Sequence, residues 1–194
     1  MVKLFGDFDN NMPVSEGFLI LGFLPTSIPL KQRWRNTGLS ADFLADYLVT
    51  FFPTNETDER NSLKNPAEIK NAVSYIANEL LENAMKFSNQ NASYPITLKL
   101  HLHPRRIVFC ITNSISYENM NKFQQFIEKM ISSDPQELYI CQLEENAKND
   151  KSTESKLGLL TMVNDYMAKI GWKFEIPQEE PKLITVSTMV QLTV

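Results

Sequence analysis

The side chains best suited to chemistry lie between residues 65 and 88. Glu79, Asn83 and Lys86 are spaced four and three residues apart, and Tyr75 lies one turn earlier, so a helix would place all four on one face. A carboxamide oxygen can ligate Mg²⁺, a carboxylate can orient or deprotonate a hydroxyl, and a lysine can reach phosphate oxygens. On spacing alone, a solvated helix face is the simpler interpretation of the same pattern.

Local signals in this segment predict the helix that the spacing requires. Asn65 suits the N-cap, Pro66 suits the first helical position, and Glu68 completes a capping box. Apolar residues then recur every three or four positions as far as Phe87. The pattern predicts a helix over residues 65–88 with one core-facing stripe.

The residues from Glu79 to Ser88 resemble the N-box of the Bergerat-fold ATPases, which include gyrase, Hsp90, histidine kinases and MutL. They also resemble the serine kinases that regulate sigma factors by partner switching. The family form is approximately E-x-x-x-N-A-x-K-[FHY]-[ST], and every specified position is met. The resemblance implies that Asn83 holds the Mg²⁺ of Mg·ATP, that Glu79 is the catalytic base and that Lys86 contacts phosphate.

Two glycine-rich motifs accompany the N-box in this family, and both are incomplete here. The first is D-x-G-x-[GA], whose Asp accepts a hydrogen bond from the adenine amino group; Asn113 takes the Asp position, and neither glycine is present. An Asn carbonyl can still accept, but the side chain also brings a donor and no charge. In the second box only Gly158 matches. The sequence explains this residue equally well as a motif glycine or as an ordinary glycine in the first turn of a core helix. A helix beginning there, with Lys156 beside it, would suit phosphate.

These departures leave the ligand open. The pocket could bind ATP weakly, bind ATP only when a partner closes the lid, or hold a different ligand such as a flavin nucleotide. In the flavin alternative, Tyr75 stacks on the planar ring while Lys86 and Lys156 hold the phosphate tail.

Residues 65–194 follow the order of elements that the resemblance implies, from the N-box helix to the closing strands. We expect short strands or an extended arm in 14–30, a helix over 41–52 capped by Ser40, and a mobile lid over 143–156. The remaining elements are predicted as strands at 96–102, 107–111, 172–176 and 183–194, and helices at 116–132 and 157–170, the last ended by Gly171. The fold class is therefore α+β: a two-layer sandwich of Bergerat type, with a mixed, mostly antiparallel sheet and helices on one face.

Composition limits the class of protein. The 194 residues carry a net charge of −4 and suit one globular unit, with residues 1–60 as an N-terminal extension on a 61–194 ATPase domain. Neither a dominant basic run nor a long apolar segment occurs, so we expect no nucleic-acid partner and no membrane span. Two distant cysteines and a charged N-terminus favour the cytoplasm.

Two hypotheses for function follow. The resemblance is closest to SiaB-type and anti-sigma-like regulators, which implies a Mg·ATP-dependent serine/threonine kinase whose partner is a small protein of STAS or SiaC type. The alternative is a non-catalytic binding module, in which the former ATP pocket is empty or refitted. A basic and aromatic cluster at residues 31–35 is a candidate contact for a partner or a second copy.

Overall fold

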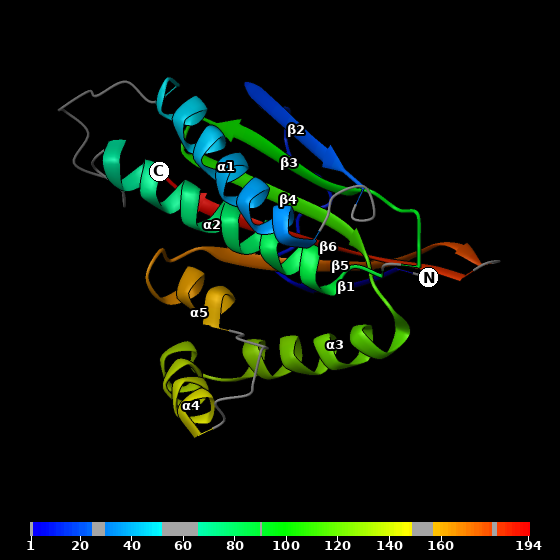
Figure 1. The fold of residues 1–194 in the computed structure, drawn as a ribbon. Coiled ribbons are helices and arrows are strands. Elements are labelled where there is room, and N and C mark those ends of the chain that lie inside the picture. Colours follow the sequence, from blue (N-terminus) through cyan, green and yellow to red (C-terminus); the bar gives the residue numbers. More distant parts are fainter. Residues whose placement is uncertain (1, 25–29, 52–65, 90, 149–156, 180–181) are drawn as a thin grey trace.

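The computed structural model describes residues 2–24, 30–51, 66–89, 91–148, 157–179 and 182–194. They form an α+β fold with one six-stranded sheet and five helices, shown in Figure 1. The strands are β1 (Val2–Gly6), β2 (Gly17–Phe23), β3 (Ile96–His103), β4 (Arg106–Ser114), β5 (Lys169–Glu179) and β6 (Lys182–Thr193). The helices are α1 (Leu30–Val49), α2 (Pro66–Phe87), α3 (Tyr117–Ser132), α4 (Pro135–Lys148) and α5 (Leu157–Asn164).

The sheet has the order β1-β5-β6-β4-β3-β2, and every neighbouring pair among these strands is antiparallel. The prediction of a mixed sheet is therefore wrong for the described strands. Strands β1 and β2, from the N-terminal 60 residues, form the two edges of the same sheet as β3 to β6. The α+β class and the helix layer on one side are as predicted.

The helices cover one face of the sheet. Helix α2 lies beside α1 in this layer (Figure 1) and packs against β3 and β4, and its apolar stripe is fully buried. Helix α3 lies over β5 and β1, where the Phe123 ring meets Trp172 and Phe174 edge-on and Lys3 of β1 bonds Gln124. The predicted helices at 65–88 and 116–132 are confirmed within two residues at either end.

A strap of residues 7–16 crosses the opposite face of the sheet, because β1 and β2 lie at opposite edges. It begins at Gly6, whose φ of 59° lies in the left-handed region that glycine tolerates. Its Asp7 carbonyl accepts from Gln191, and its Asp9 backbone N–H lies 3.5 Å from the Met189 sulfur. At its end, the Glu16 N–H donates to the Leu102 carbonyl oxygen. The sequence predicted neither this strap nor β1.

The predicted start of the first helix is wrong. Helix α1 begins at Leu30, not at residue 41, so Ser40 lies inside it rather than at its N-cap. Gly38 lies inside the helix, which can contain it because a glycine in a helix interior costs only about 1 kcal/mol. The side chains of residues 31–35 lie outside the described part of the chain, so the cluster predicted there stays a prediction.

Helix α5 ends at Asn164, not at 170. Met167 adopts a left-handed φ of 51°, and the Ala168 N–H donates to the Met162 carbonyl oxygen. Residues 169–171 then pair with β6, so Gly171 is a strand residue and not a helix end. A Cβ at Gly171 would overlap the strap backbone at Asp7 and Phe8, which explains the glycine.

The predicted mobile lid is partly helical. Residues 143–148 are the last six of α4, whereas 149–156 lie outside the described residues. The helix begins after Asp134, whose Oδ1 accepts from the N–H groups of Gln136 and Glu137 at 2.9 and 3.0 Å. Helix-favouring residues then continue it through the polar stretch that appeared to be a loop.

Candidate functional site

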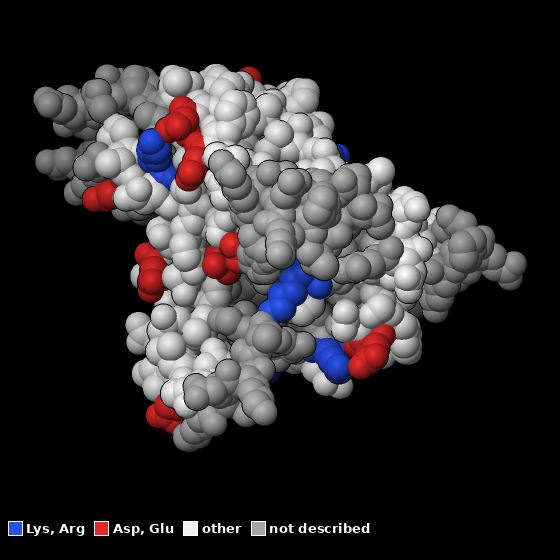
Figure 2. All heavy atoms as spheres, in the orientation of Figure 1, with Lys and Arg blue, Asp and Glu red and all other residues white. Residues whose placement is uncertain are grey.

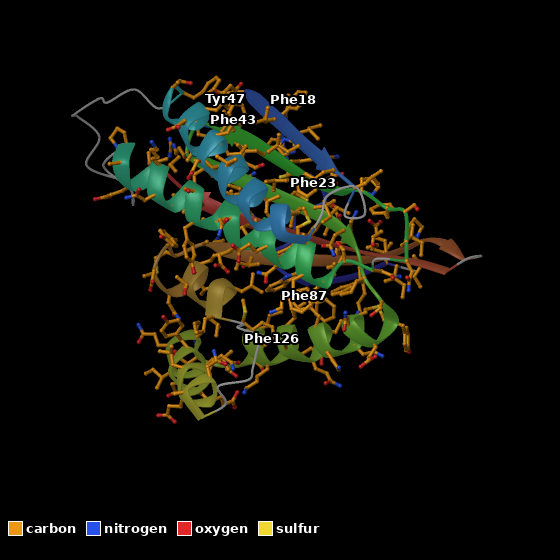
Figure 3. The ribbon with its side chains drawn as sticks, in the orientation of Figure 1. Phe18, Phe23, Phe43, Tyr47, Phe87 and Phe126 are labelled. Carbon is orange, nitrogen blue, oxygen red and sulfur yellow. The ribbon has the colours of Figure 1, made fainter. Side chains whose placement is uncertain are left out.

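A cavity of about 390 Å³ lies between the helix layer and the sheet. This front cavity has a volume in the range of small-molecule sites. Figure 3 shows Phe87 of α2 and Phe126 of α3 beside the space between these two helices. The lining residues come from α2, β4, α3, α4, α5 and β6: Leu80, Asn83, Ala84, Phe87, Ile111, Asn113, Ile115, Asn119, Lys122, Phe123, Gln125, Phe126, Lys129, Gln142, Glu145, Leu159, Val186 and Thr188.

Regular helix and strand geometry determines which polar side chains line this cavity. Leu80, Asn83 and Phe87 recur at helical spacing, so α2 presents Asn83 between two apolar neighbours on its cavity side. On the sheet, Asn113 of β4 faces Val186 of β6 in register, and both line the cavity. The cavity therefore brings together Asn83 and Asn113, the residues of the predicted N-box and of the predicted first glycine box.

The hydrogen bonding of Asn113 defines what this side chain offers. Its exposed fraction is 5%, and its Nδ2 donates to the Ser114 carbonyl oxygen at 2.9 Å. That bond uses one of the two N–H groups of the amide, so the second N–H and the Oδ1 acceptor remain for a ligand. Asn113 Oδ1 can therefore accept a hydrogen bond, which is the role of the aspartate in the motif that this segment resembles.

A second buried polar group on the sheet side of the cavity is Thr188, which is 7% exposed. Thr188 pairs with Ile111 across β6 and β4, so both point to the helix-covered face. Apolar side chains from α3 and α5, including Phe123 and Leu159, complete this part of the lining. An apolar cavity with a few polar groups suits a flat, partly polar ligand.

The rim on the α3 and α4 side carries charge. Lys122 and Lys129 are two helical turns apart on α3, and Glu145 faces them from α4. Lys122 pairs with Glu118 at 2.8 Å, in an exposed pair that contributes little to stability. Figure 2 shows basic and acidic atoms side by side at two places on this face, with further small acidic groups apart from them. The rim therefore carries two ammonium groups, of which Lys122 is paired with Glu118, and one carboxylate from Glu145.

Glu79 lies beside the cavity rather than in its lining. Its carboxylate rests against Gly158 in the first turn of α5, where an added Cβ would overlap it. Burial raises the pKa of Glu79, and the neighbouring Glu82 carboxylate raises it further. Gly158 thus provides the room that Glu79 occupies at the start of α5.

The remaining predicted site residues are placed apart from the cavity lining. The Tyr75 ring stacks on Tyr166 with centroids 5.3 Å apart, and its hydroxyl hydrogen-bonds with Thr161. Burial raises the pKa of the Tyr75 phenol, and that hydrogen bond lowers it. Lys86 is exposed with its Nζ 5.1 Å from the Phe87 ring centroid. Lys156 lies outside the described residues.

Sequence reasoning missed the contributions of α3 and α4. None of the motifs in the sequence includes Lys122, Phe123, Lys129 or Gln142. The capping signals of Ser116 and Asp134 place these helices, but no local signal indicates which of their faces borders the cavity.

No protein-family model matches the chain, and a search of curated proteins finds no match. Among the described helices, none has the length and apolar character needed to cross a membrane.

Proposed function

We propose that the chain is a nucleotide-binding regulatory protein of Bergerat type, and that its front cavity takes Mg·ATP. One observation carries this proposal: Asn83 and Asn113, the positions of the metal-binding and base-binding residues in the family motifs, line one cavity of ligand size. The proposed reaction is phosphate transfer to a serine or threonine of a small STAS- or SiaC-type protein in a partner-switching circuit.

The residues present fit a magnesium ion held mainly by its nucleotide. Mg²⁺ is commonly bound through one or two protein oxygens, substrate phosphates and water. Asn83 supplies one such oxygen on the cavity wall. In the part of the chain that the structure describes, no cluster of three or more His, Cys, Asp or Glu could hold a metal by itself. Asn83 would therefore hold the ion, which would neutralise phosphate charge.

Other side chains of the site would bind and orient. Asn113, a lining residue, would accept a hydrogen bond from the amino group of the base through its Oδ1, and apolar lining groups such as Phe123 would contact the plane of the base. Lys122 and Lys129 would neutralise phosphate charge at the rim. Glu79, whose pKa is raised, would take the proton of the attacking hydroxyl, since a base works best when its pKa is close to the working pH.

A non-catalytic module is the second candidate, and the position of Glu79 favours it. The carboxylate contacts Gly158 and is not part of the cavity lining. A residue that anchors α5 in this way need not act as a base. The aromatic lining from Phe87, Phe123 and Phe126 would equally suit a flavin ring.

Titration calorimetry of the full chain with Mg·ATP, Mg·GTP and flavin mononucleotide separates these candidates. We expect saturable Mg·ATP binding, weakened in Asn83→Ala, with a matched control in Asn89→Ala, which changes an asparagine outside the lining. Binding of the flavin alone would replace the ATP proposal with the second candidate. Binding of none of the three at millimolar concentration would contradict the ATP proposal and the flavin form of the second candidate, and would favour a module whose pocket is empty.

Phosphate transfer is tested with Mg·ATP and a candidate STAS- or SiaC-type protein. Glu79→Gln keeps the shape of the side chain and removes the base, so we expect ATP binding without transfer. Transfer at the wild-type rate in Glu79→Gln would contradict the assigned role of Glu79.

A further inference from the structure

The sheet has a second hollow, on the face opposite the helices. This back cavity, of about 400 Å³, lies over the same β4–β6 pair that borders the front cavity. Alternate residues serve the two sides: Asn113 and Val186 line the front, whereas Thr112 and Ser187 line the back. Because successive side chains of a strand point to opposite faces of the sheet, the β4–β6 pair borders one cavity on each face.

The floor of the back cavity consists of small polar side chains. Thr112 and Ser187 are in register, and their hydroxyl oxygens lie 2.7 Å apart. Thr185 is 4% exposed and Ser187 6%, although none of the described helices covers this face. Within the described residues the Thr185 hydroxyl has no hydrogen-bond partner, so it remains available to a bound group. Short side chains among longer neighbours create the hollow.

Two lysines stand on opposite sides of this floor. Lys99 of β3 is opposite Cys110, and Lys173 of β5 is opposite Ser187. Lys173 Nζ lies 2.9 Å from the Glu175 carboxylate, whereas Lys99 forms no ion pair within the described residues. The described lining therefore carries two positive charges and one negative charge, in a chain whose net charge is −4.

Apolar side chains complete the walls. Phe8 of the strap borders one side, with its ring centroid 5.7 Å from Lys173 Nζ. Tyr94, Ile176 and Pro177 border the cavity elsewhere. A ligand here would meet ammonium and hydroxyl groups at one part of its surface and aromatic or aliphatic carbon at another.

We propose that the back cavity is a binding site for a small organic phosphate. The phosphate oxygens would accept hydrogen bonds from Lys99, Lys173 and the Thr185 hydroxyl, and the apolar body would contact Phe8 and Tyr94. Ammonium groups bind phosphate as point charges, and hydroxyl groups donate to the remaining oxygens. This inference does not depend on nucleotide binding in the front cavity, because the two sites share strands but no lining residue.

Phenyl phosphate is a suitable probe, since it combines one phosphate with one ring. Calorimetry of the full chain should show saturable binding of phenyl phosphate when the probe is titrated to about 10 mM. We expect Lys99→Gln and Lys173→Gln each to weaken it about tenfold, the effect of one charge-assisted hydrogen bond. Lys169→Gln is the matched control, because Lys169 lies on the same face of β5, four residues before Lys173 and outside the cavity. Thr185→Val should weaken binding without any change in charge.

Alkylation of Cys110 locates the bound probe. Cys110 lines the back cavity, and Cys141→Ser removes the other, exposed thiol. Phenyl phosphate should slow the reaction of Cys110 with iodoacetamide in this variant. Equal affinity in wild type, Lys99→Gln and Lys173→Gln, or binding that leaves Cys110 unprotected, would overturn the proposed site. Tighter binding of benzoate than of phenyl phosphate would overturn the assignment to phosphate.

Discussion

Asn113→Ala separates a folding role from a binding role of one buried side chain. The substitution removes the 2.9 Å hydrogen bond to the Ser114 carbonyl oxygen. That carbonyl also accepts from the Asn89 N–H at 3.2 Å, so it keeps one partner. The expected cost is about 1 kcal/mol in the free energy of unfolding. For a chain of this length, the melting temperature should fall by about 2–4 °C.

The binding cost comes from the Oδ1 acceptor. Losing one hydrogen bond to the amino group of adenine should cost about 1.4 kcal/mol, a tenfold increase in the Kd for Mg·ATP. GTP lacks that amino group, so the preference of the wild type for ATP over GTP should also disappear.

Thermal unfolding of the free protein and calorimetric titration with both nucleotides measure the two effects. Asn119→Ala is the control, because Asn119 lines the same cavity from α3 while its backbone N–H, which donates to Ser116, is kept. A lower melting temperature with unchanged ATP affinity and unchanged ATP preference would refute the base-binding role of Asn113.

Three further substitutions test the surrounding structure. Burial raises the pKa of Glu79 in the folded state above its value in the unfolded state. The wild type therefore loses stability as the pH rises from the unfolded pKa through the folded pKa. Glu79→Gln cannot ionise, so its melting temperature should exceed that of the wild type at about pH 7 and not at about pH 3.5. Equal differences at both pH values would contradict this. Gly158→Ala should displace the Glu79 carboxylate and reduce phosphate transfer. Folding stability should change little, because the atoms that the new Cβ would overlap lie at the far end of the flexible Glu79 side chain. An unchanged transfer rate would show that the position of Glu79 is unimportant. In Gly171→Ala the new Cβ would overlap the strap backbone at Phe8. The free energy of unfolding, measured by urea denaturation, should fall by about 1–3 kcal/mol. Wild-type stability in this variant would show that the strap moves aside without cost.

Elements with strong local signals were predictable from the sequence. Helix α2 has a proline at its first position and a regular apolar stripe, and α3 has Ser116, whose Oγ accepts from the Asn119 N–H as an N-cap should. The alternation in β3 likewise separates buried from exposed residues. Each of these signals is local, so the rest of the fold was not needed to interpret it.

Elements that depend on distant partners were not predictable in this way. Residues 166–170 carry no periodicity that distinguishes helix from strand, and their pairing with β6 determines that β5 begins at Lys169. Strand β1 is five residues long, and its place at the sheet edge depends on pairing with β5. The beginning of α4 did carry a local signal at Asp134, but the polar composition from residue 143 onward favoured a mobile lid there.

The same distinction applies to the candidate site. The motif residue Asn83 and the corresponding position Asn113 were named from the sequence, and both line the front cavity. Helical spacing places Tyr75 on the same face of α2 as Asn83, yet its ring packs on Tyr166, in the segment after α5. Lys129 borders the cavity only because α3 packs across β5 and β1, which no local pattern indicates.

A crystal structure of the full chain with Mg²⁺ and a non-hydrolysable ATP analogue tests the central proposal most directly. We predict the adenine beside Asn113 Oδ1 and the metal-bound phosphates beside Asn83, within the cavity between α2, the sheet and α3. An analogue bound elsewhere, or a front cavity that stays empty at saturating nucleotide, would contradict the proposal.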